Sequence, residues 1–166
     1  KKTYEEIFTE FEGTNIDSAA GAGDVKYHKG FSSMWPGSQG DLYVNLLANP
    51  SHLEAVNPVV LGFSRAKADI EYQSDYSKVL PLIIHGDAAV AGQGIGQEVI
   101  QMSQLKGYRN FGTIHFVINN QIGFTTDWDD ARSSDYCTAV ASMLNCPVFH
   151  VNGDSVEDVI FACEAA

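Results

Sequence analysis

The chain has 166 residues, of which 45% are hydrophobic and 19% charged, and its formal net charge at pH 7 is −11. This composition excludes a disordered chain and supplies enough apolar residues for one domain with a core. The acidic balance argues against nucleic acid and anionic membranes as partners, because both carry negative charge. A bound anion would therefore need local hydrogen-bond donors and a cation.

The cysteines and the chain ends indicate the setting of the protein. Cys137, Cys146 and Cys163 show no CxxC spacing, so we expect buried, reduced thiols in a reducing compartment. No segment reaches the roughly 18–20 apolar residues of a membrane span, and no signal peptide is visible. The chain begins without methionine and stops inside a helical pattern, so we expect a piece of a longer polypeptide.

The first half of the chain predicts few regular elements. Apolar residues at helical spacing indicate a helix that ends at Gly13. Residues 15–41 are rich in Gly and Ser and predict a long loop, a feature that is often functional. Residues 42–47 are a candidate strand, and residues 58–71 are a candidate helix.

The second half alternates strands and helices. Strands are expected at residues 79–84, 114–118 and 147–151, and helices at residues 94–105, 134–144 and 155–164, the last with Ser155 as its N-cap. The alternation predicts an α/β fold with a parallel sheet, and short apolar strands are typical of sheets with helices on both faces. Residues 1–78 then form a leading helix, loops and a helix, and residues 79–166 form the parallel strand–helix units.

Polar residues directly follow two of the predicted strands. Asp87 follows the strand at 79–84, and Asn119 and Asn120 follow the strand at 114–118. Ligands of parallel sheets bind beyond the carboxyl ends of the strands. A carboxylate, an amide oxygen and a backbone carbonyl suit Mg²⁺, which prefers oxygen ligands and completes its shell with water and phosphate.

A glycine-rich segment lies between these two motifs, with Gly92, Gly94 and Gly96 where a helix should begin. Helix N-termini attract phosphate, so the residues together predict a metal-bridged diphosphate. A Rossmann fingerprint is not matched, because position 97 is Gln, and the chain has no Walker A loop. Taken singly, Asp87 and Asn120 would be read as cap and turn residues.

Longer motifs resemble one enzyme family. Gly86-Asp87-Ala88, followed thirty residues later by Asn119-Asn120, resembles the thiamine-diphosphate motif of transketolase-like enzymes. Further motifs occur in order at residues 23–28, 48–56, 85–89, 92–94, 119–126, 132–134 and 150–154. They are similar to the thiamine-diphosphate-dependent component of 2-oxoglutarate dehydrogenase complexes, in which Ala is expected at the position of Ala88. The resemblance implies part of a thiamine-diphosphate-binding, transketolase-like fold.

The resemblance implies roles at the metal motif. Asp87, Asn120 and the carbonyl of Ile122 would hold Mg²⁺. Ala88 and Ala89 would lie against thiamine diphosphate, with Asp87 reaching the diphosphate through the metal.

Two earlier segments would complete the site under this resemblance. Ser51 and Leu53 would line the thiamine pocket, and His28 and His52 would face the substrate. Histidine can donate a hydrogen bond to the distal carboxylate of 2-oxoglutarate, although a loop histidine taken alone is read as a solvated or capping residue. His85, beside the site, stays undecided.

We expect no role in the reaction for the remaining two histidines. His115 and His150 lie in or beside predicted strands, so both are expected to be structural, with hydrogen bonds to the backbone.

The reaction implied is decarboxylation of 2-oxoglutarate with succinyl transfer to a lipoyl-bearing succinyltransferase component. Departures at Lys29 and residues 61–64 leave 2-oxoadipate open as the substrate. Such enzymes complete the site with a pyrimidine domain of a second subunit in a homodimer, so we expect no turnover by the 166 residues alone. The alternatives are an isolated Mg²⁺–diphosphate-binding module and a Rossmann-type nucleotide binder. The implied compartment is the cytoplasm of a bacterium or the mitochondrial matrix of a eukaryote.

Overall fold

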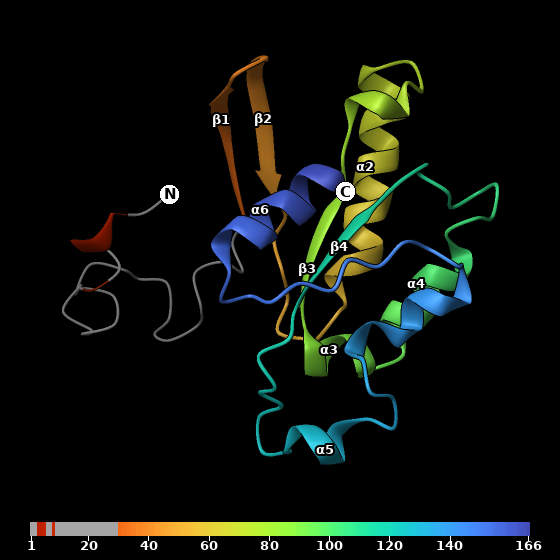
Figure 1. The fold of residues 1–166 in the computed structure, drawn as a ribbon. Helices are drawn as coiled ribbons and strands as arrows, with labels where there is room; N and C mark the ends of the chain where they lie inside the picture. Colours follow the sequence, from red (N-terminus) through yellow and green to blue (C-terminus); the bar gives the residue numbers. More distant parts are fainter. Residues whose placement is uncertain (1–2, 6–7, 9–29) are drawn as a thin grey trace, which may run out of the picture. The chain divides into compact units, whose positions relative to one another are not determined.

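The computed structural model of the chain describes residues 3–5, 8 and 30–166. The chain divides into two compact units, Lys1–Ser51 and His52–Ala166 (Figure 1). Of the helix predicted before Gly13, the described residues 4–5 and 8 are helical and the rest lies outside the described residues. The candidate substrate residue His28 also lies outside them.

The first unit contains an antiparallel hairpin, β1 (Phe31–Gly37) with β2 (Gly40–Leu46). The strand expected at 42–47 is confirmed as part of β2, whereas the loop expected over 15–41 is wrong from residue 31 onward. Ser and Gly are common both in long loops and in short turns, and here they lie in and beside the two-residue turn at residues 38–39 between the strands. Gly40 follows that turn with φ +126°, a conformation that glycine adopts without steric cost.

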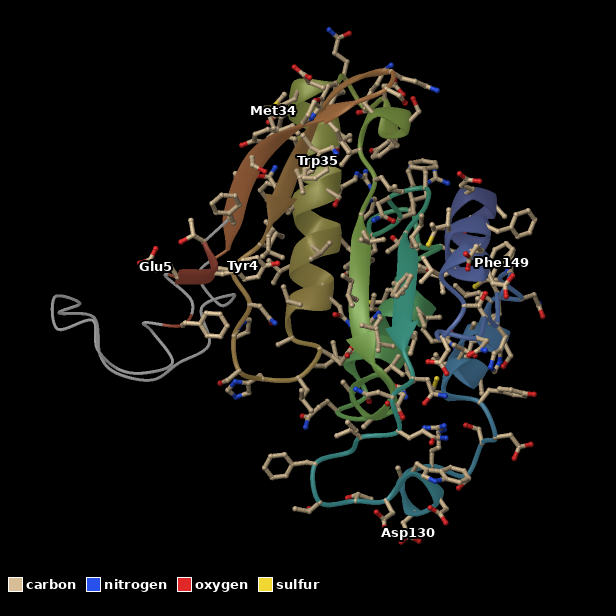
Figure 2. The ribbon with its side chains drawn as sticks, turned by 60° about the vertical axis from the view of Figure 1, so that its left-hand side comes forward. Tyr4, Glu5, Met34, Trp35, Asp130 and Phe149 are labelled. Carbon is tan, nitrogen blue, oxygen red and sulfur yellow. The ribbon has the colours of Figure 1, made fainter. Side chains whose placement is uncertain are left out.

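The hairpin exposes large apolar side chains. Met34 and Trp35, labelled in Figure 2, are 57% and 59% exposed. Across the strands, the Ser32 hydroxyl donates to Asn45 Oδ1 at 2.6 Å. Pairing of polar residues across the two strands therefore accompanies the backbone ladder.

The second unit alternates helices and strands, which confirms the α/β class. Its elements are α2 (Val56–Glu71), η2 (Tyr76–Lys78), β3 (Leu82–Gly86), α3 (Asp87–Ala91), α4 (Ile95–Met102), β4 (Ile114–Ile118), α5 (Trp128–Ala131), η3 (Cys137–Met143) and α6 (Val156–Ala165). Ser155 caps α6 by accepting from the backbone N–H of Asp158, as predicted. The segment expected as a helix at 134–144 is instead the 3₁₀ helix η3, whose seven residues have no side-chain cap and no buried residue.

Strands β3 and β4 form a parallel pair and lie side by side in Figure 1. β4 has the predicted bounds, and β3 begins three residues later than expected because η2 and Pro81 precede it. The strand expected at 147–151 is wrong, and the described residues form only two parallel strands. In the segment 147–151, Val148 and Phe149 are 49% and 52% exposed. Their apolar character favours a strand, but a strand also needs a neighbouring strand with which to pair.

Burial alternates along β3. Ile83 and His85 are 4% and 2% exposed, whereas Leu82 and Ile84 are 49% and 63% exposed. The described residues therefore bury one face of this strand, where the sequence predicts that both are covered.

The described residues add two findings on the class of protein. None of their helices is both long and apolar enough to cross a membrane. All three cysteines are free thiols; Cys137 is half-buried, and Cys146 and Cys163 are exposed. The predicted burial is thus wrong for the last two, because α6, which carries Cys163, has no buried residue and the strand expected after Cys146 does not form.

Asp69 on α2 is the acceptor of a surface hydrogen-bond network. Its carboxylate accepts from Tyr76 Oη at 2.6 Å, Ser74 Oγ at 2.8 Å and Arg65 Nε at 2.9 Å. These bonds, with that from Tyr76 the largest cause, lower the pKa of Asp69 from 3.8 to about 2. Because the folded-state pKa is the lower one, the network stabilises the fold above the unfolded-state pKa and this contribution is lost as the pH falls through about 2.

We therefore expect Asp69→Asn to lower the melting temperature near neutral pH, and the difference from wild type to disappear as the pH falls from about 4 to about 2. Thermal melts followed by circular dichroism across this range test it. Glu71→Gln is the control, since it removes one ion pair with Lys67 on the same helix and leaves the Asp69 network intact. A difference that is the same at every pH would contradict the assignment.

Candidate functional site

The ends of β3 and β4 bring the two polar motifs to one edge of the sheet. Gly86 is paired with Ile118 in the parallel ladder, so the residues that follow each strand leave from the same place. The loop after β4 then packs on α3: a Cβ built on Gly123 would lie 3.5 Å from the Ala88 Cβ. Asp87 and Asn120, 33 positions apart in the sequence, are thereby brought to one edge of the sheet.

Asp87, the first residue of α3, is the buried charge of this edge. It is 2% exposed, and its Oδ2 accepts from Nη1 of Arg132 at 3.2 Å. Its Oδ1 is buried and has no hydrogen-bond partner. A buried carboxylate oxygen left unpaired is costly, so this atom fits a metal ligand.

The loop after β4 is held by an Asx turn. Asn120 Oδ1 accepts from the backbone N–H of Ile122 at 3.1 Å, and Gln121 between them has φ +59°. Both Asn120 and Ile122 are exposed. The described residues contain no group of three or more His, Cys, Asp or Glu suited to a metal, so a cation beside Asp87 would draw on amide and carbonyl oxygens.

The glycine-rich segment has local structural reasons for its spacing. Gly94 is the N-cap of α4 with φ +78°, and Gln93 before it has φ +61°. Gly96 is buried, and a Cβ built there would lie 3.5 Å from the Val90 carbonyl oxygen and 3.9 Å from Glu54 Oε2. The segment therefore begins a helix, as predicted, and the missing side chain at Gly96 leaves space for the Glu54 carboxylate beside the first turn of that helix.

A second buried carboxylate, Glu54, begins a row of hydrogen bonds. Its Oε2 accepts from His85 Nδ1 at 2.7 Å and from the Asn57 side-chain amide. His85 Nε2 lies 2.9 Å from His115 Nδ1, and the two rings stack with centroids 5.2 Å apart. When Nδ1–H of a neutral His85 donates to Glu54, its Nε2 accepts the Nδ1–H of His115.

Burial and neighbouring groups shift the pKa values of Glu54 and His115. Burial alone would raise the pKa of Glu54, but the hydrogen bonds from His85 and Asn57 outweigh it and the pKa is lowered. Burial lowers the pKa of His115, and the neighbouring His85 lowers it further. The row therefore keeps Glu54 ionised and His115 neutral near neutral pH.

The other predicted site residues differ in their burial. Ala88 and Ala89 are half-buried on α3. His52 and Leu53 are exposed, and the buried Glu54 follows them directly in the chain. Ser51 is exposed at the end of the first unit.

Sequence reasoning missed two residues of this edge. Glu54 and Arg132 both lie in motifs that carry the resemblance, yet no role was assigned to either. Their partners are 31 and 45 positions away, so no local pattern marks them. His115, for which backbone partners were expected, has a side-chain partner instead, because its Nδ1 lies 2.9 Å from His85 Nε2.

Glu54→Ala should lower the free energy of unfolding by about 3 kcal/mol, because removing one partner of a buried pair leaves His85 without its acceptor. Chemical denaturation measures this value. Glu54→Gln, which keeps an acceptor oxygen, should cost less, and His150→Ala at an exposed histidine serves as the control. Equal stability of Glu54→Ala and wild type would contradict the buried pair.

Comparisons with known proteins identify one family. The family model described as "Dehydrogenase E1 component" matches residues 1–166. The multifunctional 2-oxoglutarate metabolism enzyme of Mycolicibacterium vanbaalenii is 52% identical, over 99% of this chain and 14% of that protein. The 2-oxoglutarate dehydrogenase E1 components of Azotobacter vinelandii and Cupriavidus necator are 50% and 51% identical, over 99% and 97% of this chain and 18% and 17% of theirs. The chain thus spans less than one fifth of the length of these relatives.

Proposed function

The chain belongs to the dehydrogenase E1 component family, and we propose that it is part of the diphosphate-binding domain of a longer enzyme with a transketolase-like fold. That enzyme decarboxylates 2-oxoglutarate on thiamine diphosphate and passes the succinyl group to a lipoyl-bearing succinyltransferase component. Relatives about half identical to the chain and named for 2-oxoglutarate support the substrate. A homodimer whose second subunit completes the site is part of the same proposal.

The observation that carries the proposal is the buried Asp87 with its unpartnered Oδ1. We assign to it the single charged ligand of Mg²⁺, with Asn120 and the Ile122 carbonyl as the other protein oxygens. The Asx turn supports this assignment, since it holds Asn120 and Ile122 in one compact loop that begins beside Asp87. Octahedral oxygen ligation leaves the remaining positions of the cation to water and to phosphate oxygens.

The remaining residues have positioning roles in the proposal. Ala88 and Ala89 offer a small apolar surface on α3, Ser51 and Leu53 line the ring, and His28 and His52 donate hydrogen bonds to the substrate. When bound, thiamine diphosphate supplies the bond-breaking chemistry, and the protein contributes binding and orientation. A neutral or protonated histidine can donate to the distal carboxylate that distinguishes 2-oxoglutarate from shorter oxoacids.

Asp87→Asn in the full-length enzyme should abolish Mg²⁺-dependent binding of thiamine diphosphate, because it removes the charge while preserving shape. Asparagine is preferable to alanine here, since its amide oxygen can still accept the hydrogen bond that Arg132 donates to the buried Asp87 side chain. Calorimetric titration with thiamine diphosphate, with and without Mg²⁺, gives the measurement. Asp135→Asn, at an exposed carboxylate, is the matched control. Unchanged affinity in Asp87→Asn would overturn the metal assignment.

His28→Ala and His52→Ala should each reduce kcat/KM for 2-oxoglutarate by roughly ten- to a hundredfold, the effect of losing one hydrogen bond to a charged group. Affinity for thiamine diphosphate should change little. Steady-state kinetics with 2-oxoglutarate and with a shorter 2-oxoacid that has no distal carboxylate separate recognition of that carboxylate from a general loss of activity. The same loss on both substrates would show that neither histidine recognises the distal carboxylate.

A further inference from the structure

The buried ion pair between Asp87 and Arg132, at the edge of the sheet, has two polar atoms without a hydrogen-bond partner. Asp87 and Arg132 share one hydrogen bond, from Nη1 to Oδ2 at 3.2 Å. Asp87 Oδ1 and Arg132 Nε are both buried and both lack a hydrogen-bond partner. The side chains of Asp87 and Arg132 are 3% and 8% exposed, so bulk water does not supply the missing hydrogen bonds.

This geometry is poor for an ion pair that serves stability alone. Arginine and carboxylate commonly pair in a bidentate fork, and a buried pair is favourable only when its remaining donors and acceptors are satisfied. Here the donor Arg132 Nε–H and the acceptor Asp87 Oδ1 both remain without a hydrogen-bond partner. One ligand that presents a cation to Oδ1 and an anionic oxygen to Nε–H would satisfy both.

The chain path supports a ligand-binding role. The segment after β4 leaves the sheet beside Gly86, runs through α5, which Asp130 marks in Figure 2, and returns to Asp87 at Arg132. The extended backbone of Arg132, with φ −158° and ψ 154°, ends α5 at this point. Arg132 thus closes the loop that carries Asn120 and Ile122 onto the proposed metal ligand.

We propose that Arg132 is a diphosphate-binding residue, whose guanidinium N–H groups donate to a phosphate oxygen of the metal-bound diphosphate while Asp87 holds the metal. The proposal rests on the proposed function and adds to it the protein cation that receives the anion. A planar guanidinium suits phosphate oxygens better than an ammonium does. The net charge of −11 gives such a buried cation particular importance, since the chain as a whole repels an anion.

The test uses the full-length enzyme without cofactor, with Mn²⁺ and inorganic pyrophosphate as probes. Mn²⁺ binding is measured by water proton relaxation, and pyrophosphate binding by calorimetry at saturating Mn²⁺. Arg132→Lys keeps a positive charge beside Asp87, so the fold is preserved, but it lacks the Nε–H donor and the planar fork. Arg132→Met removes the charge as well. Arg109→Met, at an exposed arginine over the Phe111 ring, is the control.

We expect both Arg132 variants to bind pyrophosphate at least tenfold more weakly, as for the loss of one charge-assisted hydrogen bond. Mn²⁺ alone should bind Arg132→Met as tightly as wild type or more tightly, since a neighbouring positive charge is gone. Arg109→Met should match wild type with both probes.

The possible outcomes are distinguishable. Unchanged pyrophosphate affinity in Arg132→Lys overturns the inference and leaves the proposed function standing. An equal loss of Mn²⁺ and pyrophosphate affinity in that variant also overturns it, because a residue that only holds Asp87 in place would weaken both. If wild type binds neither pyrophosphate with Mn²⁺ nor thiamine diphosphate with Mg²⁺, the proposed function fails and this inference fails with it.

Discussion

Two carboxylates taken out of water are the constraint on which the second unit depends. Asp87 and Glu54 are 2% and 8% exposed, and burying a carboxylate without hydrogen-bond partners costs free energy. The partners come from distant segments, Arg132 for Asp87 and His85 for Glu54. Each compensating bond therefore fixes one loop to the region where β3 ends. The buried residues that hold the edge together are largely polar, because Ala68, Ile83, Val90 and Val99 are the buried hydrophobic residues among those described.

The two pairs differ in how completely they are satisfied, and this difference separates structure from function. Glu54 Oε2 accepts from two donors, and His85 uses both ring nitrogens, one on Glu54 and one on His115. Such a row rigidifies the segment that carries His52 and Leu53 without leaving a buried atom unpaired in it. Asp87 and Arg132 each keep one unpaired buried atom. Unsatisfied groups of this kind occur at functional sites, where a ligand completes the bonding.

The sequence predicted the elements whose signals are local. β4 is an apolar run that only His115 interrupts and that polar residues bound, and α2 has a helical period, so both were placed correctly. The meeting of the two polar motifs followed from parallel topology alone. The hairpin of β1 and β2 was missed because serine and glycine fit a turn and a loop equally well. Arg132 and Glu54 were missed because a pairing across 31 or 45 positions leaves no periodic trace.

The uncovered face of β3 connects the fold to the proposal of a longer enzyme. Leu82 and Ile84 are apolar, and the sequence alone reads β3 as covered on both faces, yet both side chains are more than two fifths exposed. A two-stranded sheet with one open apolar face is marginal by itself, because most of its stability comes from packing against neighbouring elements. Membership in a larger diphosphate-binding domain would supply that packing. The two faces of β3 then have different roles: the buried face carries Ile83 and His85, and the exposed face, with Leu82 and Ile84, is the surface on which further elements of such a domain would pack.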